Sequence, residues 1–450
     1  MSEGPASTSA AARDLQRRVT RKVGARLLPF VGLLYFVNYL DRTNIGFAKL
    51  RMSDDLGLTE TAFGLASGLF FIGYLLLEVP SNLVLHRVGA RRWLARIMLT
   101  WGIIAAATAF VPNTGTLYAL RFLLGVAEAG FFPGVILYLT YWFPKRERGR
   151  VVAWFMVAVP ISSMIGSPLS GWIIQAGHGL FGLDGWRLMF LVEGIPSIIL
   201  AFVTWFYLTD RPSAAGWLTG EERDFLDAEM RKEQRETAAQ YHYPLRRALT
   251  NPRVIGLAFV YFGVVYGLYA LSFFLPTIVS GFQEQFGVKY SLFQVGLITA
   301  IPFALGAIAM VLWGLHADRT RERVWHVALP AFVGGIAIPI ALYLDSPFLA
   351  MVAVSVCAIG IFAALPTFWS LPTAFLTGSA AAGGIALVNS VGNAAGFAAP
   401  YVTGFLADQT GSAKVGLWVV GATMVGAGII TLVLRAAPNH SSDHENSSLP

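Results

Sequence analysis

Residues Leu117 to Phe143 read LYALRFLLGVAEAGFFPGVILYLTYWF, and this stretch decides the fold class. It is long enough to cross a bilayer as a helix, and its only charged residues are Arg121 and Glu128. Because they are seven positions apart, about two helical turns, their side chains share one helix face. An ionised group at the centre of a bilayer costs at least about 2.5 to 3.5 kcal/mol. We therefore predict that both side chains face protein or water and have a functional role.

The composition is that of a polytopic membrane protein. The 450 residues are 55% hydrophobic and only 13% charged, with a mean hydropathy of +0.60, whereas soluble chains carry about 25% charged residues. The net charge of +7 comes from short Lys and Arg clusters between apolar runs, so we expect no nucleic-acid partner. A single cysteine, Cys357, allows neither an intramolecular disulfide nor a cysteine-based metal site. We expect no metal, no cofactor and no enzymatic activity.

Apolar windows of about 20 residues predict twelve membrane spans, six on either side of a charged central segment. Numbered in chain order, the spans are centred near Val37, Phe71, Ile103, Val126, Ile161, Leu200, Gly267, Thr299, Ile336, Gly360, Val391 and Gly426. The predicted fold class is an all-α integral membrane protein, with twelve transmembrane helices in two pseudo-symmetric six-helix bundles. The predicted segments are a cytoplasmic N-terminal tail (1–25), a first bundle (26–209), a cytoplasmic linker with an amphipathic helix (210–252), a second bundle (253–435) and a disordered C-terminal tail (436–450).

The basic residues fix the predicted orientation, because Lys and Arg accumulate on the cytoplasmic side. With the N-terminus inside, 25 of the 33 Lys and Arg residues lie on cytoplasmic segments. We predict a multi-pass protein of the plasma (inner) membrane with both termini in the cytoplasm, and a monomer within the lipid bilayer. In the linker, Thr219 and Glu222 form a capping-box pattern that predicts the start of a surface helix.

In each half, one basic, glycine-bearing loop follows the second span. The two loops read NLVLHRVGARR (82–92) and GLHADRTRER (314–323), and they resemble the signature loop of the major facilitator superfamily, Gly-x-x-x-Asp-Arg-x-Gly followed by basic residues. The first copy has Asn82 and His86 where Gly and Asp are usual, and the second has Arg321 in place of the second Gly. The resemblance implies loops that gate conformational change, through Arg87, Gly89, Arg91, Gly314, Asp318 and Arg319.

Further motifs are similar to the anion:cation symporter family within that superfamily, a branch that includes tartrate, phthalate, 4-hydroxyphenylacetate and sugar-acid carriers. They are NYLDRTNIGFA, EVPSN, RFLLGVAEAGFFPG, YWFPKRERGR and NSVGNAAGFAAPYVTG. The resemblance implies proton-coupled uptake of a small organic anion by alternating access. It also implies coupling and binding roles for two pairs of residues. These are Asp41 and Arg42 at the end of span 1, and Arg121 and Glu128 in span 4.

A carboxylate inside a membrane cavity needs a fixed cation, and the planar guanidinium of Arg matches it bidentately. Arg42 and Arg121 are the span-embedded candidates for substrate binding, besides Arg96 near the inner end of its span. Arg121 could instead form a structural ion pair with Glu128, and Arg42 could extend toward the membrane surface.

Proton coupling needs a carboxyl group that alternates between charged and neutral close to the substrate. Asp41 and Glu128 fit that role, because a nearby Arg favours the charged form while desolvation favours the neutral one. The alternative for each is a permanently paired structural carboxylate. Glu193 is predicted to be structural.

Polar and aromatic residues at helical spacing are secondary candidates for binding, with interhelical hydrogen bonding or packing as the alternative. The polar set is Tyr35 and Asn38 on span 1, Tyr74, Glu78 and Asn82 on span 2, and Asn389 and Asn393 on span 11; the aromatic set is Tyr266, Tyr269 and Trp369.

The predicted substrate is a small hydroxy acid such as tartrate, or a sugar acid, with aromatic acids such as phthalate or 4-hydroxyphenylacetate as the alternative. Uniport, exchange or export of the anion are alternatives within the transporter class. A membrane sensor that transports nothing is the alternative from another class.

Overall fold

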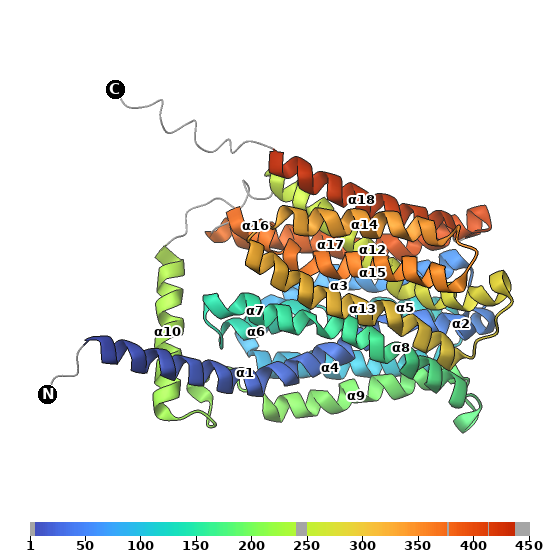
Figure 1. Cartoon of the computed structure of the whole chain (residues 1–450). Helices are drawn as coiled ribbons and strands as arrows, with labels where there is room; N and C mark the ends of the chain where they lie inside the picture. Colours follow the sequence, from blue (N-terminus) through green and yellow to red (C-terminus); the bar gives the residue numbers. More distant parts are fainter. Residues whose placement is uncertain (1–4, 240–249, 376–377, 413, 437–450) are drawn as a thin grey trace.

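The computed structural model describes residues 5–239, 250–375, 378–412 and 414–436, and these form long helices without a strand. The predicted disordered tail lies, apart from Ala436, outside the described residues. The helices run roughly parallel in two groups (Figure 1).

The first half consists of α1 (Pro5–Thr43), α2 (Ile45–Leu56), α3 (Glu60–Val88), α4 (Ala90–Ala107), α5 (Thr114–Glu128), α6 (Phe131–Thr140), α7 (Lys145–Met156), α8 (Ala158–Ala176) and α9 (Gly185–Tyr207). The second half consists of α12 (Pro252–Phe286), α13 (Leu292–Thr320), α14 (Val324–Ala341), α15 (Pro347–Phe368), α16 (Ser370–Phe375), α17 (Gly378–Thr410) and α18 (Lys414–Ala436).

Eleven spans among the described residues are long and apolar enough to cross a membrane. The remaining predicted span is α17, a helix of 33 residues that packs against α3 and α12. Its sequence contains Asn389, Asn393 and several glycines, which lower its hydropathy relative to its neighbours. The helix is thus long enough to span, and its polar residues are concentrated where it faces the other half.

Three spans of the first half are interrupted. The predicted single helix through Leu117–Phe143 is two helices, because the chain leaves helical geometry at Ala129 and Gly130. Gly130 has φ +86°, a left-handed conformation that favours glycine. Shorter interruptions separate α1 from α2 and α7 from α8. At the Ala129–Gly130 break both residues are buried, so the polar backbone lies inside the bundle rather than against lipid, where it would lack partners.

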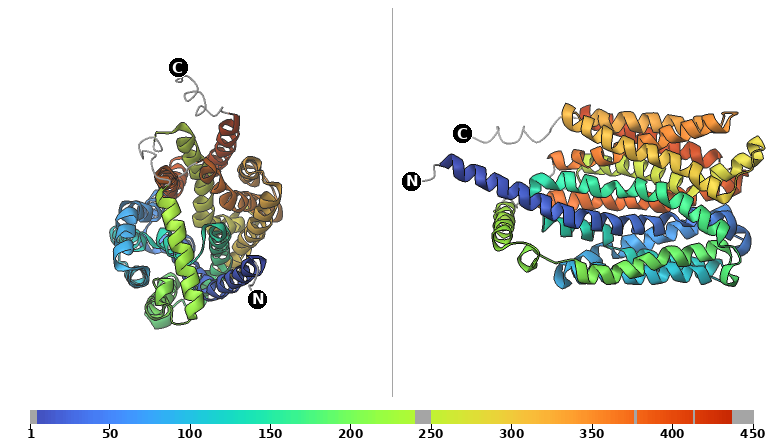
Figure 2. Two further views of the ribbon diagram at one scale, coloured as in Figure 1. Left: turned by 90° about the vertical axis from the view of Figure 1, so that its left-hand side faces the viewer. Right: turned by 60° about the horizontal axis from the view of Figure 1, so that its bottom comes forward.

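An amphipathic helix, α10 (Gly220–Ala239), lies across one end of the bundle, which we call the α10 end (Figure 2). The predicted capping box forms, with Thr219 and Glu222 exchanging side-chain to backbone hydrogen bonds of 3.0 and 3.2 Å. Glu222 also accepts a 2.6 Å bond from Lys22 of α1, which lowers the pKa of that carboxyl. Arg148 of α7 pairs with Glu233 at 2.7 Å. These contacts attach α10 to the first half.

The two halves meet through α3 against α17, α8 against α13 and α2 against α12. At the end opposite α10, which we call the Glu60 end, the halves are joined by hydrogen bonds. Asp408 of α17 accepts bonds of 3.2 and 2.8 Å from the backbone N–H groups of Glu60 and Thr61, the first residues of α3. Gln175 of α8 accepts from the N–H of Phe293 at 3.1 Å. An anionic side chain at a helix N-terminus is favourable, so the Asp408 contacts help to hold the two halves together at the Glu60 end.

Within the first half, α5 approaches α3 so closely that a Cβ at Gly125 would overlap the carbonyl oxygen of Phe70. We predict that Gly125→Ala lowers stability by about 1 to 3 kcal/mol, because the helix backbones must separate. Gly115→Ala on the same helix is the control, since its Cβ would have no neighbour nearer than 3.4 Å. The measurement is the melting temperature of the detergent-solubilised protein. Equal melting temperatures for the two variants would contradict this packing.

Candidate functional site

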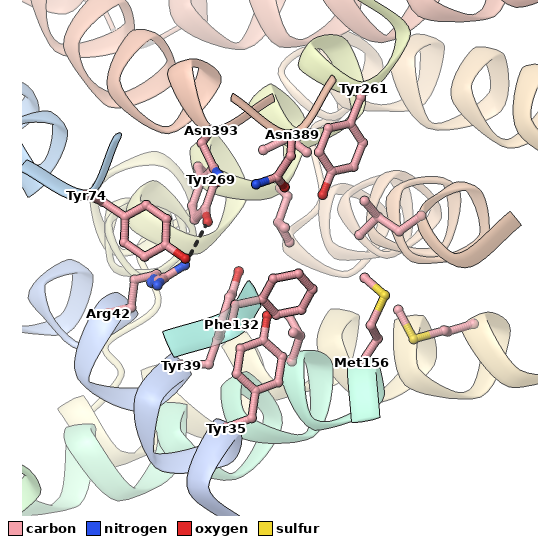
Figure 3. Close-up of a pocket in the computed structure, with 15 residues that line it drawn as sticks. Tyr35, Tyr39, Arg42, Tyr74, Phe132, Met156, Tyr261, Tyr269, Asn389 and Asn393 are labelled. Atoms are coloured by element: carbon pink, nitrogen blue, oxygen red, sulfur yellow. Dashed lines mark hydrogen bonds between the residues drawn. The ribbon is translucent and has the colours of Figure 1, made fainter. Parts of the chain in front are cut away.

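A cavity lies at the middle of the interface between the halves and comprises about 580 Å³ of space between protein atoms, open solvent included. Side chains from both halves line it, and five of them are tyrosines (Figure 3). The first half contributes Tyr35, Tyr39, Arg42, Tyr74, Phe132, Met156 and Val159, and the second half contributes Tyr261, Val265, Leu268, Tyr269, Met310, Leu365, Asn389 and Asn393.

An ion pair between Arg42 and Glu128 joins the cavity wall to the broken span. Arg42 Nη2 donates to Glu128 Oε2 at 2.9 Å, and both side chains are almost completely buried. Asn38 Nδ2 donates to the same oxygen at 2.9 Å. Arg42 Nη1 also donates to the hydroxyl of Tyr269, in the other half, at 3.3 Å (Figure 3). The guanidinium therefore bridges a carboxylate of one half and a phenol of the other.

Helical spacing explains why α1 supplies so much of this site. Tyr35, Asn38, Tyr39 and Arg42 recur at intervals of three and four residues, so they form one face of the helix. Glu128 is the last residue of α5, where the break at Ala129 begins. The break ends α5 beside that face of α1, so its terminal carboxylate meets the Arg42 guanidinium.

Arg121 has a different environment from the one its spacing suggested. It is buried, and its guanidinium lies 5.4 Å from the centre of the Phe70 ring. Among the residues that the structure describes, none of its three nitrogens makes a hydrogen bond. Glu128 pairs with Arg42 rather than with Arg121. A buried cation with no hydrogen-bonded partner is unfavourable. Arg121 does not line the cavity, and its role in substrate binding remains a prediction.

Asp41, the neighbour of Arg42, points away from the cavity. Its Oδ2 accepts hydrogen bonds from Trp101 Nε1 at 2.8 Å and from Ser197 Oγ at 2.7 Å. The residue is buried and has no ion-pair partner among the described side chains. Asp41 does not line the cavity, and its role in proton coupling remains a prediction.

Span 2 contributes a contact that crosses between the halves beside the cavity. Asn389 Nδ2 of α17 donates to Glu78 Oε1 of α3 at 2.7 Å. Tyr74, one turn earlier on α3, lines the cavity, whereas Asn82 bonds to the carbonyl of Glu78 on its own helix. Of the predicted line on span 2, Tyr74 faces the cavity and Glu78 links the halves.

One of the three aromatic candidates lines the cavity and two do not. Tyr269 lines the cavity, but Tyr266 and Trp369 do not; Trp369 packs against the ring of Tyr261 at 4.8 Å and so supports the wall from behind. Sequence reasoning missed Tyr39 and Tyr261. Tyr39 follows Tyr35 by four residues and Tyr261 precedes Tyr269 by eight, so the same helical spacing could have identified both.

The predicted gating loops lie at the α10 end, far along the helices from the cavity. Gly89 has φ +98° and separates α3 from α4, and Asp210 accepts a bond of 2.8 Å from the N–H of Arg91. In the second half Asp318 pairs with Arg323 at 2.9 Å. Gly314 and Arg319 lie in the last turns of α13, and Arg87 lies in the last turn of α3. Their gating role remains a prediction.

The cavity lining combines a buried cation, phenols and amides, the groups that recognise a polar anion, and the Glu128 carboxylate is bonded to that cation. Among the described residues, no group of three or more His, Cys, Asp or Glu side chains could hold a metal ion.

The sequence pattern of the Major Facilitator Superfamily matches residues 31–400. The chain belongs to this superfamily. It is therefore a multi-pass membrane transporter of a non-enzymatic class, and the predicted twelve-helix fold is confirmed.

Relatives of the chain carry names with different substrates. A protein of Agrobacterium vitis named "Putative tartrate transporter" is 50% identical over 428 residues, 95% of this chain and 97% of that protein. A protein of Acinetobacter baumannii named "Quinolone resistance transporter" is 40% identical over 423 residues, 94% and 96% of the two chains. A solved structure of the xylose transporter XylE from E. coli, partially occluded and inward open, is similar with a TM-score of 0.69 at 16% identity, over 91% and 97% of the chains. The last likeness concerns the fold alone.

The Arg42–Glu128 pair yields a stability prediction. Glu128→Gln leaves a buried guanidinium without its anion, so we expect a loss of about 3 to 5 kcal/mol, seen as a lower melting temperature. In the double variant Arg42→Gln, Glu128→Gln, both charges are absent, and most of that loss is expected to be recovered. A double variant less stable than Glu128→Gln alone would show that the two residues do not act as a pair.

Proposed function

We propose that the protein takes up a small organic carboxylate together with at least one proton, as a member of the anion:cation symporter branch. A hydroxy acid such as tartrate, or a sugar acid, is the proposed substrate class. The observation that carries the proposal is the Arg42–Glu128 pair at the cavity wall, because a cation and a titratable carboxyl share one hydrogen bond there. The name of the Agrobacterium vitis relative supports the same class.

The proposed coupling is an exchange of partners. A substrate carboxylate that takes the Arg42 Nη atoms competes with Glu128 Oε2, and a Glu128 that loses its cation becomes neutral by binding a proton. Glu128 Oε1 accepts no hydrogen bond from the described residues, so it offers a place for that proton. Binding of anion and proton then favour one another, which is the thermodynamic condition for symport.

The hydroxyl groups of the cavity favour a hydroxy acid. Tyr35, Tyr39, Tyr74, Tyr261 and Tyr269 bring phenols that donate and accept, and Asn389 and Asn393 add amides. Aromatic acids are the alternative, favoured by the stacked pairs that Tyr35 forms with Phe155 and Tyr261 forms with Phe368. Since the aromatic faces mostly contact one another, we place the hydroxy acids first.

Alternating access is the proposed route through the membrane. The contacts of Asp408 and Gln175 close the Glu60 end, while the cavity lies between halves that are linked at its level by Glu78 and Asn389. Rocking of one half against the other would break the contacts of Asp408 and Gln175 and open the Glu60 end. In this proposal the α10 end, where the basic loops gather, faces the cytoplasm, and the protein acts as a monomer in the plasma membrane.

The test is uptake of labelled tartrate by the full-length protein in proteoliposomes with an acidic exterior. We expect accumulation that collapses when a protonophore removes the gradient. Glu128→Gln is expected to lose the response to the gradient while still exchanging labelled for unlabelled tartrate at equal pH. Its control is Glu221→Gln on the surface of α10, which should behave as the wild type.

Gradient-driven accumulation by Glu128→Gln at the wild-type rate would remove Glu128 from the coupling mechanism. The substrate class is tested separately, by the shift in melting temperature with tartrate, gluconate, phthalate and 4-hydroxyphenylacetate, since a ligand that binds the folded state raises it. A shift with the two aromatic acids alone would favour the aromatic alternative. No shift with any of the four would contradict an organic-anion substrate.

A further inference from the structure

A further buried carboxyl group, Glu193 of α9, has no part in the proposed symport mechanism. Its Oε1 accepts from Ser170 Oγ of α8 at 2.7 Å and its Oε2 accepts from Asn44 Nδ2 at 2.9 Å, beside the break between α1 and α2. The side chain is 2% exposed. Both of its partners are neutral, and no cation is bonded to it among the residues described.

The charges in the centre of the first half do not balance. Four carboxyl groups, Asp41, Glu78, Glu128 and Glu193, are buried there with two guanidinium groups, Arg42 and Arg121. Among the described residues, Glu128 is the one of the four that forms an ion pair. Because an isolated buried carboxylate is far less favourable than a neutral acid, this imbalance favours a proton on at least one of the three unpaired acids.

Glu193 and Asp41 form successive steps along α9. Ser197, which donates to Asp41, follows Glu193 by four residues, so both lie on one face about one turn apart. Asp41 lies within electrostatic range of both Glu193 and Glu128. The elements packed around Glu193 contribute Asp41 and Asn44 from the α1–α2 break, Ser170 from α8 and Trp101 of α4 through its bond to Asp41. Asp41 is the only titratable group in this set.

Asn44 and Ser170 also line a second, smaller cavity of about 280 Å³ of space between protein atoms, open solvent included, which leaves room for about one water. Its polar lining is Thr43, Asn44, Ser163, Ser167, Ser170 and Ser272, so we call it the serine cavity. Buried Ser163 Oγ and Asn44 Oδ1 have no hydrogen-bond partner among the described residues, which suits a wet site. Ser170 is six residues from the end of α8 at the Glu60 end, so the serine cavity lies on that side of Arg42.

We propose that Glu193 is a proton-binding residue that takes protons from the serine cavity and passes them by way of Asp41 to Glu128. Glu193 gains a proton on a carboxylate oxygen when the Glu60 end opens, and returns to the carboxylate when Asp41 accepts that proton. Asp41 in turn becomes a carboxylate as Glu128 is neutralised and releases Arg42 to the substrate. The proposal rests on the proposed symport, and it extends the path toward the Glu60 end.

Infrared difference spectroscopy of the purified full-length protein in lipid, titrated with acid and base alone, tests proton binding without substrate. Glu193→Gln keeps both hydrogen bonds, because the amide oxygen accepts from Asn44 and the amide nitrogen donates to Ser170, so it is expected to fold. We expect a titrating carboxylic-acid C=O band in the wild type that is lost in Glu193→Gln and displaced in Glu193→Asp. Identical titrations of wild type and Glu193→Gln would overturn the proposal.

Uptake of labelled tartrate tests whether that proton is coupled to transport. Glu193→Gln is expected to slow gradient-driven accumulation by about tenfold or more, to keep exchange at equal pH, and to be rescued in part by Glu193→Asp. Glu221→Gln is the matched control. Unchanged accumulation by Glu193→Gln would overturn the proposal. Failure of the wild type to accumulate tartrate would count instead against the proposed function, and the infrared titration would still decide whether Glu193 binds a proton.

Discussion

The ion pair between Arg42 and Glu128 is the constraint on which the rest of the site depends. Two opposite charges at the centre of a membrane protein persist only if each is satisfied by the other and by further hydrogen bonds. Asn38 supplies one such bond to Glu128, and Tyr269 supplies an acceptor to Arg42 from the opposite half. The position of the pair therefore depends on how α1, α5 and α12 meet, and a movement between the halves changes its surroundings.

This dependence connects electrostatics to conformational change. The bond to Tyr269 crosses between halves, as does the bond between Glu78 and Asn389, whereas the bond to Glu128 stays within one half. A ligand that replaces Glu128 as the partner of Arg42 thus changes the charge of the first half and its contact with the second at the same atoms. In the proposed mechanism, binding, protonation and rocking share one set of interactions, so no separate signal between distant sites is needed.

The sequence predicts the features that rest on local patterns. The spans, the division into two halves and the start of α10 at Thr219 follow from hydropathy and a capping box. Helical spacing predicts that Tyr35 and Arg42 share one face of α1, and both line the cavity. The high cost of charge in lipid predicts that Arg121 and Glu128 are shielded from it, and both are buried. These properties depend on neighbours within a few residues, which a single sequence displays.

The features that the sequence does not predict are choices among distant partners. Nothing local decides that Glu128 pairs with Arg42, 86 residues away, instead of Arg121 on its own helix. The break at Ala129 is signalled only by glycines that equally suit close helix packing. Asp41 turns to Trp101 and Ser197 because α4 and α9 pack there, a tertiary contact without a pattern in the sequence.

The most direct test of the partner exchange at Arg42 is calorimetric titration of tartrate into the purified protein, in two buffers with different heats of ionisation. The difference in heat gives the number of protons taken up with each anion. Our account predicts net proton uptake on binding to the wild type, and a smaller uptake on binding to Glu128→Gln. Tartrate binding without proton uptake at every pH tested would contradict it.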